Sequence, residues 1–176
     1  MKIIQWTLAV LGAVVLLVVA GGFFIPSAFR VERTLVINAA PKKVYDLVVE
    51  PRQWVKWSVW NQRDPNMKIT YKGPPFGMGA KWDWVSKTEG SGSMEITRVE
   101  PDRAVEYSLF LPDYNMRSAG VITLEPAGTA TQVTWRFTGD VGGNPVKHYL
   151  TITMDRMVGP DFEAGLANLK ALAEKP

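Results

Sequence analysis

The C-terminal segment, residues 154–173, most constrains the fold, because its apolar side chains recur at steps of three and four residues. This spacing predicts an amphipathic helix with one wide apolar stripe. The stripe keeps its phase across Gly159 and Pro160, which favours one long helix kinked at Pro160 over two helices joined there. A single helix with such a stripe needs a sheet to lie on. The preceding chain must therefore supply that sheet.

The region before this helix reads as a series of strands with short connections. Short connections between consecutive strands predict an antiparallel meander. Alternating apolar residues between turn-forming boundaries give seven strands, at residues 30–38, 67–72, 80–86, 93–100, 104–111, 117–125 and 131–138.

Short helical segments separate the first two strands. Pro41 begins a helix and Pro51 ends it. Trp54, Trp57 and Trp60 follow at intervals of three, so they share a face on a helical turn. We interpret this face as a plug that seals one end of the core, with the aromatic wall of a pocket as the alternative.

The N-terminal segment that begins at Ile3 and ends at Ile25 contains no charged side chain. As a helix it spans about 35 Å, against about 30 Å for the hydrocarbon core of a bilayer. We interpret it as a single-pass membrane anchor, residues 1–26, followed by a domain over residues 30–174. A signal peptide cleaved after Ala20 is the alternative. The orientation of the span is weakly specified by charge, because Lys2 before it is opposed by Arg30 and Arg33 after it. The short segment before the span favours a domain on the periplasmic side.

Composition excludes several classes of site. The 20 Lys+Arg residues nearly balance the 17 Asp+Glu, and no run of four basic residues exists, which argues against a nucleic-acid partner. With no cysteine and one histidine, His148, we expect no metal site and no two-histidine catalysis. No nucleotide-binding motif is present, so we also expect no cofactor. The sequence carries no signal for oligomeric state or protein partners.

Several short motifs carry a family resemblance: Ala40-Pro41 before Val44-Tyr45, the tryptophan segment, Asp64-Pro65-Asn66-Met67, Gly77-Met78-Gly79-Ala80, Gly92-Ser93-Met94 and Gly159-Pro160-Asp161-Phe162-Glu163. With them the chain resembles the polyketide cyclase/dehydrase and lipid-transport group of the SRPBCC (START/birch-allergen-like) superfamily, in particular its membrane-anchored bacterial members. The resemblance implies an α+β helix-grip fold, in which a curved seven-stranded antiparallel sheet wraps around the C-terminal helix and leaves an apolar cavity. It also implies a hydrophobic ligand, and some members are cyclases or dehydratases.

Strand alternation and the helical stripe predict which side chains face that cavity. A filled core is the alternative for each of them. His148 lacks a nucleophile or carboxylate partner at a motif spacing, so we interpret it as a surface or helix-start residue. Asp83 and Glu95 could meet across neighbouring strands, although solvated charges on the sheet are the simpler interpretation. The predicted lining residues are Trp57, Trp60, Trp84, Tyr107, Trp135, Phe137, Met157, Phe162 and Leu166.

These expectations favour a membrane-tethered protein that binds or transports a lipid, isoprenoid or polyketide-like molecule. One alternative is a cyclase- or dehydratase-type enzyme that acts on such a ligand. The other is a protein-interaction module that takes no ligand. A carrier is favoured over an enzyme because catalysis needs a polar group aimed into the cavity, and no catalytic residue is predicted.

Overall fold

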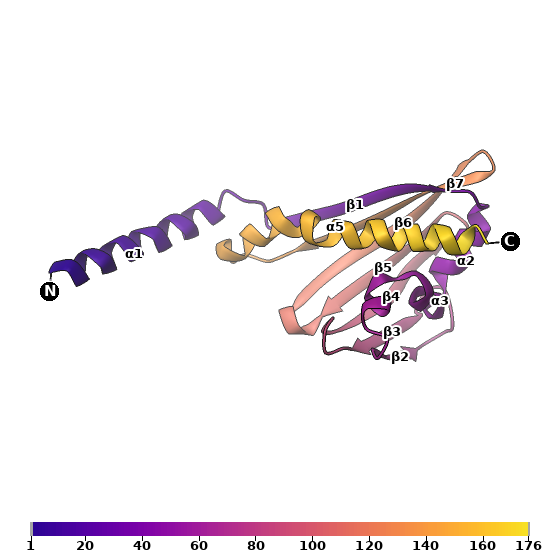
Figure 1. Ribbon diagram of the computed structural model, residues 1–176, viewed down its shortest axis with the longest axis horizontal. Coiled ribbons are helices and arrows are strands. Elements are labelled where there is room, and N and C mark those ends of the chain that lie inside the picture. The colour runs from indigo at the N-terminus through magenta and orange to yellow at the C-terminus, as the bar shows by residue number, and fades with distance from the viewer. Residues whose placement is uncertain (1, 176) are drawn as a thin grey trace.

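The computed structural model describes residues 2–175, so Met1 of the expected anchor, residues 1–26, lies outside the described residues. An N-terminal helix projects from a sheet that curves around a long C-terminal helix (Figure 1). The elements are α1 (Lys2–Gly22), β1 (Ala28–Ile37), α2 (Pro41–Val49), α3 (Pro51–Trp57), α4 (Val59–Arg63), β2 (Lys68–Lys72), β3 (Lys81–Val85), β4 (Ser91–Glu100), β5 (Ala104–Leu111), the 3₁₀ turn η1 (Pro112–Tyr114), β6 (Met116–Ala127), β7 (Ala130–Asp140) and α5 (Pro145–Ala173).

The strands form one seven-stranded sheet in the order β1-β7-β6-β5-β4-β3-β2. Every neighbouring pair is antiparallel, and β2 to β7 follow one another as a meander. The first strand returns to pair with the last, so that Val31 lies opposite Phe137. The expected seven-stranded antiparallel sheet and the α+β helix-grip fold are confirmed.

The C-terminal helix α5 is one element of 29 residues. It begins at Pro145, where the Asn144 side chain accepts a hydrogen bond from the Val146 amide at 3.0 Å and caps the helix. The helix continues through Pro160, so the single-helix interpretation is confirmed and the two-helix alternative is wrong.

Gly159, in the middle of α5, allows the Arg33 side chain from β1 to pack directly against the helix backbone. A Cβ at this position would overlap the guanidinium group of Arg33 from β1. Arg33 donates hydrogen bonds to Asp155 at 2.8 Å and to Glu163 at 2.6 Å, one helical turn on either side of Gly159. The hydrogen bond from Arg33 holds the pKa of Asp155 below its usual range. The missing side chain of Gly159 therefore makes room for Arg33 to bind Asp155 and Glu163, an arrangement that we call the arginine clamp.

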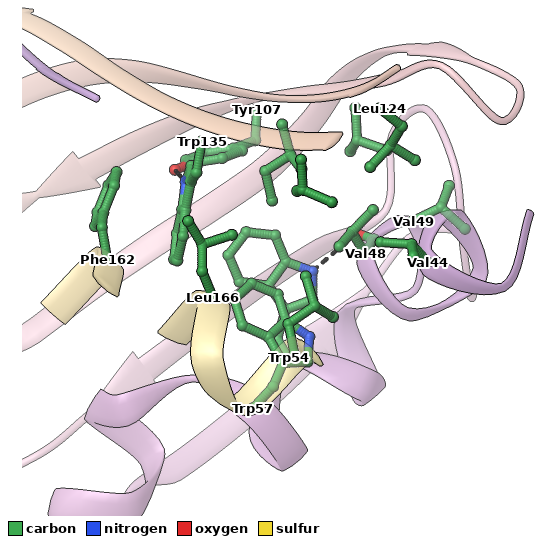
Figure 2. Packing of buried hydrophobic residues seen from close by; sticks show 14 of the residues in the cluster. Val44, Val48, Val49, Trp54, Trp57, Tyr107, Leu124, Trp135, Phe162 and Leu166 are labelled. Atoms are coloured by element: carbon green, nitrogen blue, oxygen red, sulfur yellow. Dashed lines mark hydrogen bonds between the residues drawn. The ribbon is translucent and has the colours of Figure 1, made fainter. Parts of the chain in front are cut away.

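Two tryptophans from α3 fill the closed end of the core (Figure 2). The indole nitrogen of Trp54 donates to the Val48 carbonyl at 2.9 Å, and that of Trp57 donates to the Leu47 carbonyl at 3.1 Å. Their rings lie 4.5 Å apart, centroid to centroid. Because both indole N–H groups bond to α2, these residues fix α3 against α2 and seal one end of the space between the sheet and α5.

Candidate ligand-binding cavity

A cavity of about 230 Å³ lies between the inner face of the sheet, α4 and α5. Aromatic and aliphatic side chains dominate its wall, and no cluster of acidic or histidine side chains able to hold a metal ion occurs within residues 2–175. Its lining residues are Trp54, Ser58, Trp60, Asn61, Met67, Ile69, Trp82, Trp84, Glu89, Met94, Tyr107, Leu109, Leu111, Met116, Trp135, Phe137, Met154, Val158 and Phe162.

Most of the predicted lining residues come together at this cavity. Their side chains come from α4, from three strands of the sheet and from α5, so the wall is assembled from distant parts of the sequence. They are Trp60, Trp84, Tyr107, Trp135, Phe137 and Phe162.

Three predicted residues lie elsewhere. Trp57 and Leu166 are buried in the core beside the cavity and do not line it. Met157 is 64% exposed and faces away from the sheet, so its predicted position on the wall is wrong. The reason is angular: successive residues of a helix are about 100° apart, which places Met157 well outside the narrow face that carries Val158 and Phe162.

Four lining methionines come from four different parts of the chain, and none of them is among the nine predicted lining residues. Met67 and Met116 were missed because each is alone on its own segment, whereas alternation with Ile96 along β4 was a signal that could have found Met94. Trp82 shares a strand face with Trp84, so strict alternation along β3 was a signal that could have found it. Thioethers on flexible side chains suit a wall that adapts to its contents.

The floor of the cavity carries a polar pair that the sequence analysis missed. Tyr107 on β5 lies opposite Gly120 on β6, and any Cβ at Gly120 would overlap the Tyr107 ring. The ring therefore reaches across β6, and its hydroxyl oxygen accepts a hydrogen bond from Trp135 Nε1 at 2.8 Å, a pair that Figure 2 shows from close by.

The Tyr107 hydroxyl keeps its own proton available. The side chain is buried, and burial raises the pKa of Tyr107 far above its ordinary value, so the hydroxyl stays protonated at any physiological pH. Among residues 2–175 it accepts from Trp135 and donates to no protein acceptor. The Tyr107 hydroxyl therefore remains a hydrogen-bond donor on the wall of a mostly apolar site.

One charged side chain of the cavity wall, Glu89, lies beside an ion pair outside the wall. Arg63, at the end of α4, donates to Asp161 on α5 at 3.0 Å and lies 3.6 Å from the carboxylate of Glu89. The hydrogen bond with Asp161 raises the pKa of Arg63, so the Arg63 guanidinium stays charged. Glu89 is the one acidic residue in the described cavity wall, and its carboxylate faces this arginine.

The other titratable candidates lie away from the cavity. Asp83 and Glu95 do not meet: Asp83 pairs with Lys72 at 2.5 Å and Glu95 lies 3.9 Å from Lys81, so they are the solvated sheet charges of the simpler interpretation. His148 lies near the start of α5, as expected, but it is buried and does not line the cavity.

The model of the polyketide cyclase/dehydrase and lipid transport family matches residues 28–174. The chain belongs to this family. The match begins after α1 and covers the whole domain from β1 to α5, so the family assignment concerns the helix-grip domain alone. No curated protein sequence matches the chain.

Solved structures share the fold at low sequence identity. A protein of unknown function from Staphylococcus aureus superimposes with a TM-score of 0.64 at 13% identity, covering 84% of this chain and 94% of that one. A protein from Chromobacterium violaceum superimposes with a TM-score of 0.57 at 17% identity, covering 85% of this chain and 99% of that one. The di-domain ARO/CYC protein BexL of the BE-7585A biosynthetic pathway superimposes with a TM-score of 0.59 at 17% identity, covering 85% of this chain and 51% of that one. At these identities the likeness shows the fold alone.

Helix α1 has the length and apolar composition of a membrane span over Ile3–Gly22, and its 18-residue apolar window is not buried against the domain. A signal sequence near an N-terminus has the same length and composition.

Proposed function

We propose that this protein is membrane-tethered and binds a hydrophobic small molecule in the cavity between the sheet and α5. The observation that carries the proposal is a cavity of about 230 Å³ whose wall is built mainly from tryptophan, phenylalanine, methionine and leucine side chains. For scale, a dry apolar cavity of about 150 Å³ takes up benzene. A fused two-ring system, or a short stretch of isoprenoid chain, therefore suits the available space.

The polar floor narrows the ligand class to molecules with an oxygen acceptor. The free donor of Tyr107 would otherwise be buried without a partner, and an unsatisfied buried polar group costs about 1–3 kcal/mol. A ketone, quinone or hydroxyl oxygen at the buried end of the ligand would accept this bond. The rest of the ligand would contact the aromatic and methionine wall.

The proposal assigns α1 the role of anchor. A span of this length would hold the domain beside a bilayer, where lipids and isoprenoids are concentrated. We place the domain outside the cytoplasm, because a single N-terminal span with a short head favours that orientation.

An enzyme of cyclase or dehydratase type is the second candidate. The observation that favours it is a carboxylate, Glu89, on the same cavity wall as the protonated hydroxyl of Tyr107. Such a reaction needs a base for a carbon-bound proton and a donor for the oxygen. The Glu89 carboxylate already lies 3.6 Å from the Arg63 guanidinium, so it is engaged with a cation and not free toward the cavity, and we favour binding without catalysis.

The test compares two probes that differ by one oxygen, 2-acetylnaphthalene and 2-ethylnaphthalene. The full chain in nanodiscs is titrated with each probe, tryptophan emission reports uptake, and empty nanodiscs give the background. A neutral buried hydrogen bond contributes about 0.5–1.5 kcal/mol, so the parent should prefer the ketone by roughly 2- to 12-fold. Tyr107→Phe should abolish that preference. Tyr114→Phe, at a residue 73% exposed, is the matched control and should keep it.

Absence of saturable uptake of either probe by the parent would refute the binding proposal. Equal affinity for both probes would leave binding intact and refute the assigned role of Tyr107.

A further inference from the structure

The junction between α1 and the domain is built from specific contacts. The glycine pair that ends α1, Gly21 and Gly22, lies directly against the start of α5. A Cβ at Gly21 would be 2.6 Å from the Tyr149 hydroxyl oxygen, and one at Gly22 would overlap the Pro145 carbonyl. At Gly22 the neighbouring atoms are backbone, so only a residue without a side chain fits there.

Hydrogen bonds hold the junction in one geometry. The ring of His148 lies between two carbonyl oxygens, that of Gly22 at 2.8 Å from Nδ1 and that of Gly142 at 2.9 Å from Nε2. The hydroxyl of Thr151 lies 3.0 Å from the Pro26 carbonyl oxygen and 2.8 Å from that of His148, so it shares its proton between the two. The domain is therefore held against the end of α1 at several points, and its orientation relative to that helix is fixed.

One of these contacts sets the depth of α5 relative to the span. The Tyr149 hydroxyl donates to the carbonyl of Val18 at 3.0 Å. Val18 lies four residues before the end of α1, which is about 6 Å inside it at 1.5 Å per residue. The first turns of α5 thus overlap the last turn of the span, at the level where a bilayer changes from acyl chains to headgroups.

The side chains at that level suit a membrane interface. Val146 is 50% exposed and Leu150 is 51% exposed, and they follow at the i, i+4 spacing that places them on one face of α5. Tyr149, beside them, is an aromatic residue of the type that gathers at interfaces, and exposed Lys147 suits anionic headgroups.

We propose that the first turns of α5, at Val146, Tyr149 and Leu150, lie in the bilayer interface and form a second lipid contact beside α1. This inference rests on the proposed role of α1 as the anchor. The cavity wall begins at Met154, four residues after Leu150 on the same helix, or about 6 Å along its axis. The contact would therefore bring the nearest part of the cavity wall within about one helical turn of the lipid.

The chain contains no cysteine, so a single introduced cysteine can be labelled at one site. The full chain carries an NBD fluorophore at Leu150→Cys, with Val146→Cys as an independent second site. Leu11→Cys, in the middle of α1, reports the anchor. Met157→Cys is the matched control on α5, because it is 64% exposed and about 10 Å further along the helix. The proteins are reconstituted into phosphatidylcholine–phosphatidylglycerol vesicles with nitroxide lipids labelled at a shallow or a deep carbon.

The labels on Leu150→Cys and Val146→Cys should be quenched at least twice as strongly by the shallow nitroxide as by the deep one. The Leu11→Cys label should show the reverse order, and the Met157→Cys label should show neither effect. If the first two labels behave like Met157→Cys while Leu11→Cys is quenched by the deep nitroxide, the anchor stands and the α5 contact is refuted. If Leu11→Cys is not quenched, the anchor itself is wrong, and the inference falls with it.

Discussion

Replacing Phe162 by alanine tests whether the space beside α5 is a ligand site or solid core. The side chain is 2% exposed, stacks on the Trp135 ring at a centroid distance of 4.0 Å and an interplanar angle of 13°, and lines the cavity. Phe162→Ala therefore removes both a packed aromatic contact and part of the cavity wall. The two effects have different signatures, one in stability and one in ligand choice.

The expected loss of stability follows from these contacts. In a packed core, Phe→Ala costs about 3–5 kcal/mol, because lost burial adds to the cost of a new void at roughly 24 cal/mol per Å³. At Phe162 the new space merges with a cavity that is already open, so most of the void cost is absent. The remaining loss of burial and of the stacked pair gives about 2–3 kcal/mol. For a chain of this size that lowers Tm by about 4–12 °C.

The assay is the melting curve of the full chain in detergent, followed by near-ultraviolet circular dichroism, together with uptake of 2-acetylnaphthalene and the larger 2-acetylanthracene. Phe162→Ala should shift the preference toward the three-ring probe. Phe29→Ala is the matched control, because Phe29 is 6% exposed and does not line the cavity. Phe29→Ala should lower the free energy of unfolding by the full value of about 3–5 kcal/mol and leave the probe preference unchanged. A loss near 5 kcal/mol for Phe162→Ala without any change in probe uptake would contradict the cavity and favour the interaction module.

Two further predictions concern the polar floor and the arginine clamp. Introducing a Cβ with Gly120→Ala should push the Tyr107 ring aside, lower the free energy of unfolding measured in urea by about 1–3 kcal/mol and abolish the preference for the ketone probe. The control Gly143→Ala, at a site with open space, should change neither the free energy of unfolding nor the probe preference. Full stability of Gly120→Ala would refute the close packing of Tyr107 on Gly120. Because hydrogen bonding to Arg33 lowers the folded-state pKa of Asp155, this carboxylate stabilises the fold above its unfolded pKa of about 3.9, and the contribution is lost as pH falls through the lowered value. Urea denaturation of Arg33→Gln between pH 5 and pH 2 should therefore show a weaker fall in stability than the parent, and an identical pH profile would show that the clamp contributes nothing.

Sequence alone determined the elements whose signal lies in consecutive residues. The apolar stripe of α5, the alternation along β1 and β7 and the uncharged stretch of α1 each follow from local periodicity, which the covalent geometry of helix and strand imposes. The motif around Gly159 was visible as part of the family resemblance. Because the faces of the strands follow from alternation, Tyr107, Trp135 and Phe137 could be placed on the inner face of the sheet before the fold was known.

Tertiary structure decided what those faces enclose. Trp57 and Trp60 share one sequence pattern, yet the first is buried in core and the second lines a cavity, because the space between α4, α5 and the sheet depends on how separate elements pack. The Tyr107–Trp135 hydrogen bond joins residues 28 positions apart and needs the missing side chain of Gly120 between them. The packing of Arg33 on Gly159 and its hydrogen bond to Glu163 likewise join the first strand to the last helix. Such contacts depend on distances between elements, which no local periodicity encodes.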